Sequence, residues 1–204
     1  MSGDNLATGR VILLNGTSSA GKSSIAAELL RILDYPYFHI PVDGINAMRA
    51  DGWAQRLGPD HFTTVLTRTV LGFHRAVAGM AMAGNNVVMD HVLREPEWLD
   101  DCLRVLAGIE VVFVGVVCPL PELIRRERAR GDRQIGRAEH QFPRVHTHGE
   151  YDVECDSDRL TPLQCAETIT DYSHPPRAFQ RLREVRNIPP CDSGVPFLEP
   201  PRCV

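Results

Sequence analysis

The stretch that most constrains the fold of this chain of 204 residues is VILLNGTSSAGKS, at positions 11–23. Its second part, GTSSAGKS, fits the pattern G-x-x-x-x-G-K-[ST]. Such a loop holds phosphate groups with backbone N–H groups and with the positive end of the helix that follows. An apolar strand must therefore precede it and a helix must follow, and the residues around Gly16 and Lys22 meet both conditions. We expect a phosphate-binding loop here.

Lys22 is the only lysine in the sequence, which otherwise uses arginine wherever it has one of these two basic residues. A compact ammonium group can reach between the β- and γ-phosphates, whereas a guanidinium group is larger and planar. Recognition of guanine by the N-K-x-D sequence of Ras-type GTPases needs a second lysine, so ATP is favoured over GTP. The predicted nucleotide-binding residues are Gly16, Thr17, Ser18, Ser19, Ala20, Gly21, Lys22, Ser23 and Ser24.

Short apolar runs alternate with segments of helical period along most of the chain. The expected strands are residues 10–15, 37–42, 86–90, 110–118 and 151–156. The expected helices are residues 23–33, 61–83, 95–107, 120–131 and 161–172, the last with Thr161 as N-cap. This alternation predicts an α/β fold of three layers, in which helices cover both faces of a five-stranded parallel sheet.

The C-terminal segment has a different character. Seven of the 31 residues from His174 onward are proline, and the apolar period disappears. We therefore expect one domain over residues 1–174, followed by a proline-rich tail over residues 175–204 that is extended or disordered.

Composition excludes several classes of protein. A formal net charge of −4 argues against a nucleic-acid binder, which would show a basic face. There is no run of 18 apolar residues and no secretory signal at the N-terminus, so we expect no membrane association and a cytoplasmic location. The six cysteines form no C-x-x-C pair, which favours buried free thiols. The oligomeric state stays open, a homo-oligomer included.

Asp43 and Asp90 each follow an apolar run that we expect to be a strand. Ligands bind at the carboxyl ends of the strands in open parallel sheets, where the phosphate loop also lies. A helix N-cap is the ordinary role of such an aspartate, but two of them at this edge favour function. We predict that Asp43 orients an acceptor hydroxyl group and takes its proton late. Asp90, with the Ser23 hydroxyl group, would hold Mg²⁺.

Arginines are concentrated in RRERARGDR, at positions 125–133. A solvated helix face is one interpretation. Because Gly131 breaks the helix, we favour an arginine-rich lid that closes over ATP, with Arg130 and Arg133 on the phosphates. The predicted catalytic residues are thus Lys22, Asp43, Arg130 and Arg133.

The chain resembles the chloramphenicol phosphotransferases, a family of small P-loop kinases. The residues that carry the resemblance are ILLNGTSSAGKSS, VDGINAM, NVVMDHVL, ERARGDR and VHTHGEYDVECDSD. It implies ATP-dependent phosphorylation of a primary hydroxyl group of chloramphenicol, which inactivates the antibiotic. It also implies that Asp43 is the catalytic aspartate and that Arg130 and Arg133 are lid arginines.

Two segments depart from the family pattern. The family can carry paired aspartates after its third strand, where this chain has Asp90 and His91, and residues 44–61 do not clearly match its acceptor-binding region. The leading hypothesis is a kinase that acts on a small-molecule hydroxyl group, most directly that of chloramphenicol. A sugar, a metabolite acid or a nucleotide as acceptor stays open, as does a nucleotide-binding switch without transfer.

Overall fold

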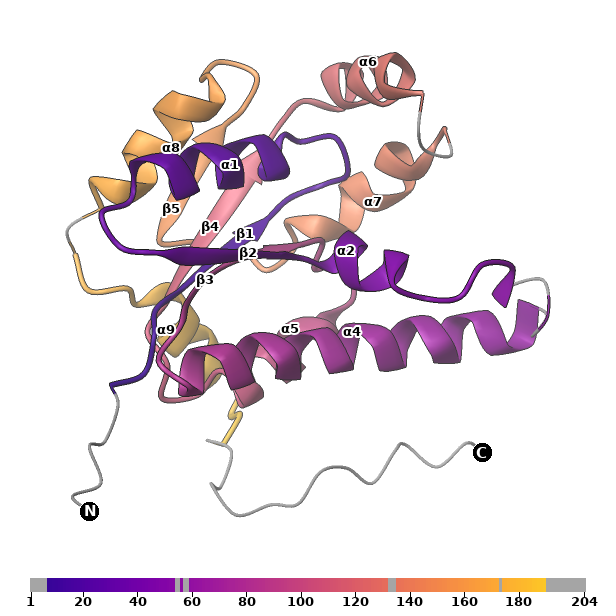
Figure 1. Cartoon of the computed structure of the whole chain (residues 1–204). Helices are drawn as coiled ribbons and strands as arrows, with labels where there is room; N and C mark the ends of the chain where they lie inside the picture. Colours follow the sequence, from indigo (N-terminus) through magenta and orange to yellow (C-terminus); the bar gives the residue numbers. More distant parts are fainter. Residues whose placement is uncertain (1–6, 54–55, 57–58, 132–134, 173, 190–204) are drawn as a thin grey trace.

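The computed structural model describes residues 7–53, 56, 59–131, 135–172 and 174–189. Five strands form one sheet in the order β2-β3-β1-β4-β5, and all neighbouring pairs are parallel (Figure 1). The strands are β1 (Val11–Asn15), β2 (Tyr37–Pro41), β3 (Asn86–His91), β4 (Val111–Val117) and β5 (Val153–Asp156). The predicted α/β fold with a five-stranded parallel sheet is confirmed.

Helices cover both faces of the sheet, which gives the predicted three layers. The helices are α1 (Lys22–Ile32), α2 (Val42–Ala47), α4 (Pro59–Met82), α5 (Pro96–Val105), α6 (Leu120–Arg130), α7 (Arg137–Val145), α8 (Pro162–Thr170) and α9 (Ala178–Val185). Helices α1 and α8 lie on one face, and α4, α5 and α9 lie on the other (Figure 1). Helices α6 and α7 lie beyond the carboxyl ends of the strands, on the side of the phosphate loop.

Alternate residues of each central strand pack into two separate cores. In β1, Val11 and Leu13 join the core under α4, α5 and α9, whereas Ile12 and Leu14 join the core under α1 and α8. Strand β4 shows the same alternation and is buried over its first six residues. Fully burying one such side chain contributes about 1.5–3 kcal/mol. A sheet covered on both faces therefore explains why these strands are almost wholly apolar.

Local signals in the sequence mark the ends of several elements, and Thr161 is the N-cap that the sequence predicts. The Thr161 hydroxyl group accepts a hydrogen bond from the Gln164 backbone N–H, and the Gln164 side chain accepts one from the Thr161 N–H, so α8 begins with a capping box. Gly84, just after α4, has a left-handed φ of 89°. Pro41 closes β2, an edge strand, where its missing N–H costs no sheet hydrogen bond.

The expected extended or disordered tail from residue 175 is wrong in part, because Ala178–Val185 form the helix α9. Phe179 and Leu182 are buried, and Phe179 contacts Phe113 of β4 edge to face at 5.8 Å between ring centroids. The domain therefore extends past residue 174. With only eight residues, α9 shows too short an apolar pattern to be recognised without the surface that it covers. Residues 190–204 lie outside the described residues.

Helix α7 occupies a segment in which the sequence shows no clear apolar stripe. Its buried face consists of Ala138, Gln141 and Val145, at the helical spacing of three and four. The polar side chain in the middle of that face hides the pattern from a reading of hydrophobicity alone. The segment is thus partly a packed helix and not only a loop.

The prediction of buried free thiols is confirmed for the cysteines that the structure describes. Cys102, Cys118, Cys155 and Cys165 are buried and free, whereas Cys191 and Cys203 lie outside the described residues. Among the described helices, none has the length and apolar character needed to cross a bilayer.

Candidate active site

The phosphate loop begins where β1 ends and bends under two distinct constraints. At Gly16 the constraint is space, because a Cβ atom there would lie 2.6 Å from the Val116 carbonyl oxygen of β4. At Gly21 it is conformation, because its φ of 88° is left-handed; Ser19 also has a positive φ of 66°. The strand register sets Leu14 of β1 opposite Asp90 of β3, so the loop starts beside that carboxylate.

Several polar residues of the loop are buried inside the protein. Thr17, Ser18, Ser19 and Lys22 are all buried. The Ser18 N–H donates to Gln141 Oε1 of α7 at 2.9 Å. The Ser19 hydroxyl group is buried and forms no hydrogen bond to the described residues. A buried hydroxyl group without a partner, in a loop of this form, suits a phosphate ligand.

Lys22, Ser23 and Asp90 form a compact group at the start of α1. The Ser23 hydroxyl group donates to Asp90 Oδ2 at 2.8 Å, and Lys22 Nζ lies 3.6 Å from Asp90 Oδ1. Lys22 Nζ also donates to the Thr17 carbonyl oxygen at 3.1 Å. Burial by itself raises the pKa of Asp90, but the Lys22 ammonium group, followed by His39 and Ser23, outweighs it and lowers that pKa. The oxygen atoms of Ser23 and Asp90 are the kind of ligand that Mg²⁺ prefers.

A cavity of about 330 Å³, here called the loop hollow, opens in front of this group. Lys22, Ser23 and Asp90 line it from the loop and β3, Asp43 lines it from the first turn of α2, and Arg130 lines it from the end of α6. The structure therefore brings together the predicted donor-side residues and the predicted catalytic aspartate. Arg133 lies outside the described residues.

A second cavity of about 440 Å³, the α6 hollow, lies between the loop, α6 and the connection from β5 to α8. Arg126 lines it and donates from Nη2 to the Ser157 carbonyl oxygen at 2.8 Å. The sequence analysis favoured Arg130 and Arg133 over this arginine. Its place beside the loop depends on Ser157, a residue 31 positions away in the chain.

A third cavity of about 520 Å³, the α2–α7 hollow, lies on the other side of the loop hollow. Asp43, Arg49, Arg94 and Arg137 are its charged residues, and Trp98 forms part of its apolar wall. Trp53, which lies in the segment 44–61 that departs from the family pattern, stacks on Phe62 with ring centroids 5.4 Å apart.

The three hollows share lining residues and so lie in series. Ser19, Gly21, Ser24 and Arg130 line both the α6 hollow and the loop hollow. Val42, Asp43 and Val92 line both the loop hollow and the α2–α7 hollow. Of the remaining predicted loop residues, Ala20 is buried in the core under α1, where it serves packing. Asp43 thus stands at the junction of two cavities.

Several residues that support the site were not predicted. Asn15 Nδ2 donates to the Val145 carbonyl oxygen at 2.8 Å and to the Tyr151 hydroxyl group at 2.9 Å, and Asn15 Oδ1 accepts from the Leu93 N–H. The only sequence signal for Asn15 is a polar residue that closes an apolar strand. For Gln141, which holds the loop through Ser18, the sequence offers no signal.

A buried cluster behind β3 offers metal-binding side chains but is satisfied without a metal. In it, one ligand atom from each of His74, His91 and Cys102 lies within 4.8 Å of the others. The Val92 N–H donates to His91 Nδ1, so neutral His91 carries its proton on Nε2, which donates to His74 Nε2 at 2.9 Å. His74 then donates from Nδ1 to Asp101 at 2.7 Å.

The protonation states of this cluster agree with that chain of hydrogen bonds. Burial lowers the pKa of His74. Burial, together with the neighbouring His74 ring and the Lys22 ammonium group, lowers the pKa of His91 well below its ordinary value, so both rings are neutral. Burial raises the pKa of Cys102, which keeps the thiol protonated. Because the two Nε2 atoms are already hydrogen bonded to each other, neither is available to a metal ion. We therefore interpret the cluster as a structural support of β3.

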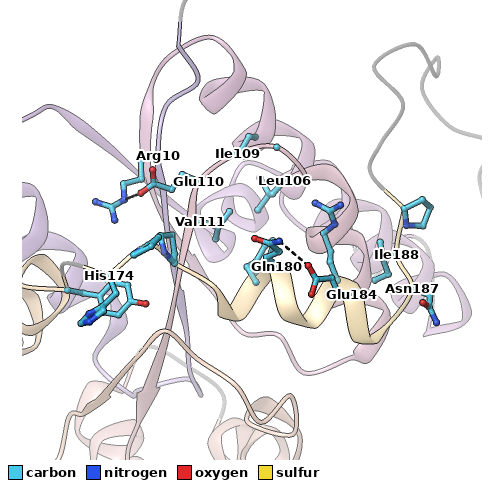
Figure 2. Close-up of a pocket in the computed structure, with 17 residues that line it drawn as sticks. Arg10, Leu106, Ile109, Glu110, Val111, His174, Gln180, Glu184, Asn187 and Ile188 are labelled. Carbon is cyan, nitrogen blue, oxygen red and sulfur yellow. Dashed lines mark hydrogen bonds and ion pairs between the residues drawn. The ribbon is translucent and has the colours of Figure 1, made fainter.

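A larger cavity, of about 1240 Å³, lies at the opposite end of the sheet (Figure 2). Arg10 and Glu110, which precede β1 and β4, form an ion pair at 2.7 Å at its edge, and Gln180 and Glu184 of α9 are hydrogen bonded to each other within it. It shares none of its lining residues with the three hollows. Ligands of open parallel sheets bind at the carboxyl ends of the strands, so the three hollows form the candidate active site.

Comparison with known families decides the class of this site. The model of a family described as chloramphenicol phosphotransferase-like protein matches residues 9–174. The chain belongs to that family. This confirms the resemblance noted in the sequence, and it makes the chain a phosphotransferase with a P-loop kinase fold. A relative in two strains of Mycobacterium tuberculosis, named "Putative O-phosphotransferase", is 32% identical over 199 residues, which cover 86% of this chain and 88% of that protein.

Solved structures agree on the fold. The APS kinase of Mycobacterium tuberculosis, solved in complex with AMPPNP and APS, aligns with a TM-score of 0.59 at 21% identity over 81% of this chain and 97% of its own. The tunicamycin resistance protein of Deinococcus radiodurans aligns with a TM-score of 0.59 at 18% identity over 79% of this chain and 94% of its own. At such identities these similarities concern the fold alone.

Proposed function

We propose that this member of the chloramphenicol phosphotransferase-like family transfers the γ-phosphate of ATP to a hydroxyl group of a small molecule. The observation that carries the proposal is the place of Asp43, which lines both the loop hollow and the α2–α7 hollow. A carboxylate at that junction would face a phosphate donor on one side and an acceptor on the other. A nucleotide-dependent switch would have no use for a carboxylate there.

On the donor side, the chain's own groups would bind a triphosphate. Lys22 would bind the β- and γ-phosphates, while Ser23 and Asp90 would hold Mg²⁺. When bound, Mg²⁺ would neutralise the negative charge that develops on the phosphate groups during transfer. Arg130, at the junction of the loop and α6 hollows, would add positive charge near the phosphates. We keep Arg133 as a second lid contact, and we assign the α6 hollow to the nucleoside.

On the acceptor side, Asp43 would orient the hydroxyl group and receive its proton. Phosphoryl transfer is largely dissociative, so the position of this carboxylate matters more than strong basicity. The α2–α7 hollow, at about 520 Å³, lies within the range of cavities that bind small molecules. Family membership makes chloramphenicol or a related alcohol the first acceptor to test, and a sugar, a metabolite acid or a nucleotide stays an alternative.

The proposal is tested with two variants and one control. Hydroxyl acceptors, chloramphenicol first, are incubated with labelled ATP and Mg²⁺, and phosphorylated products are identified by mass. Lys22→Ala should lose both nucleotide binding and transfer. Asp43→Asn should keep its nucleotide affinity and lose about 10²–10⁴ in turnover. Asp34→Asn, which changes an exposed aspartate outside the three hollows, should behave as the parent protein.

Two results would contradict the proposal. Full turnover by Asp43→Asn on its acceptor would remove Asp43 from the catalytic group. If calorimetry detected no uptake of ATP or GTP in the presence of Mg²⁺, the donor site itself would be wrong.

A further inference from the structure

The α2–α7 hollow contains more positive than negative charge. Arg49, Arg94 and Arg137 line it, against the single carboxylate of Asp43. The proposed function already assigns that carboxylate to the acceptor hydroxyl group. An uncharged acceptor would therefore leave the three guanidinium groups with only that one carboxylate to compensate their charge inside the cavity.

Arg94 is the most enclosed of the three arginines. Its guanidinium group lies 5.0 Å from the ring centroid of Trp98, and its Nε atom forms no hydrogen bond to the described residues. The nearest carboxylate oxygen, Glu95 Oε1, lies 3.4 Å from that Nε and is shared with Arg144 Nη1 at 3.5 Å. Burial lowers the pKa of Arg94; Glu95 opposes this, while Arg144 and Arg137 lower the pKa further. One carboxylate shared by two guanidinium groups leaves Arg94 undercompensated.

The other two arginines approach the hollow from different elements. Arg49, just after α2, donates to the neutral amide oxygen of Asn46 at 2.6 Å and lies over the ring of Trp53 at 4.6 Å. Arg137 is the first residue of α7, and no ion pair joins it to a carboxylate among the described residues. Guanidinium groups bind carboxylate and phosphate groups through paired hydrogen bonds. Three such groups around one cavity suit an anion.

The remaining wall of the hollow is apolar. Phe62, Leu66 and Val70 of α4 line it together with Trp98 of α5. We propose that the acceptor is an alcohol that carries a carboxylate or phosphate group on an apolar body, and that Arg94, with Arg49 and Arg137, binds this anion. The inference rests on the proposed function, since it names the class of acceptor for the same site, and it favours such an anion over chloramphenicol, which carries no charge.

The test measures anion preference directly, with the phosphate loop occupied. The full chain, saturated with ADP and Mg²⁺, is titrated in a calorimeter with benzoate, phenyl phosphate and benzamide, which share a ring and differ in charge. At least one anion should bind at least about tenfold more tightly than benzamide. The better anion distinguishes a carboxylate acceptor from a phosphate acceptor.

Matched variants locate the preference. Arg94→Gln should abolish it, whereas Arg159→Gln, which changes an exposed arginine outside the hollow, should keep it. A thermal melt checks that Arg94→Gln folds, and Arg137→Gln takes its place if it does not. In a transfer assay, para-(hydroxymethyl)benzoate should exceed its primary amide in kcat/KM by about tenfold.

The outcomes separate this inference from the proposed function. Equal binding of anions and benzamide, no measurable anion binding, or a preference that survives both Arg94→Gln and Arg137→Gln would overturn the anionic acceptor. If ADP binds normally in those titrations, the proposed phosphotransfer stands without it. If ADP does not bind, the proposed function fails, whatever the anions do.

Discussion

Glu127 offers the sharpest test of how the candidate site is held together. This carboxylate of α6 is almost fully buried. Its Oε2 accepts from the Gly136 N–H at 2.8 Å and its Oε1 accepts from the Ala138 N–H at 2.9 Å. Gly136 precedes α7 and has no side chain with which to cap it. Glu127 therefore caps the amino end of α7 from another helix.

The cost of Glu127→Gln follows from these two hydrogen bonds. A glutamine keeps one oxygen for one N–H and turns its NH₂ group toward the other. A hydrogen bond to a charged group contributes about 1.5–3 kcal/mol, and a buried donor without a partner costs about 1–3 kcal/mol. We expect a loss of about 3 kcal/mol in the free energy of unfolding. For a chain of this size, that corresponds to a fall in Tm of about 6–12 °C.

Thermal unfolding and denaturant titration measure that loss. Glu139→Gln is the matched control, because it removes an exposed carboxylate from the first turn of the same helix and should cost about 0.3–1 kcal/mol. Glu127→Gln should also weaken nucleotide binding, since α7 carries Gln141, which holds the Ser18 N–H of the loop. If Glu127→Gln were no less stable than Glu139→Gln, the capping role would be refuted.

Three further predictions concern the loop and a histidine. Asp90→Asn should still bind ATP in the absence of Mg²⁺, because Lys22 then suffices to bind the phosphates. It should lose the gain in ATP affinity that Mg²⁺ gives, and calorimetry with and without Mg²⁺ checks both results. Gly16→Ala should abolish nucleotide uptake, since its methyl group would lie 2.6 Å from the Val116 carbonyl oxygen, and normal affinity would disprove this. Acid should destabilise the fold between pH 6.5 and about 4, because burial lowers the pKa of His146 to about 4, so the unfolded chain binds more protons over that range. Denaturant titrations across that range should show that the free energy of unfolding decreases as the pH falls from 6.5 to about 4. A free energy that does not change with pH would contradict this prediction.

Much of the donor side could be predicted because its signals are local. The strand, the loop and α1 follow one another in the chain, so Lys22 and Ser23 reach the same place wherever such a segment folds. Asp43 and Asp90 needed only the rule that parallel strands present their carboxyl ends at one edge. The structure sets both at the loop hollow, and their catalytic and metal-binding roles stay predictions.

The acceptor side could not be predicted, because its residues come from distant segments. Arg49, Arg94 and Arg137 stand at the ends of three elements and have no common spacing. Arg94 differs from other arginines only because Trp98 covers it and Arg144 shares its carboxylate. Such differences arise from burial and shared partners, which no pattern along the chain records.

The sequence by itself determined the parallel sheet and the place of the phosphate loop, because both depend on periodicity and on the conformation of a few consecutive residues. Only the tertiary structure decided that α9 belongs to the domain, that α7 closes on the loop through Gln141, and that three hollows meet at Asp43. The physical reason is the range of the interactions. Backbone geometry acts between neighbours in the chain, whereas packing, capping from another helix and uncompensated charge act between groups that only folding brings together.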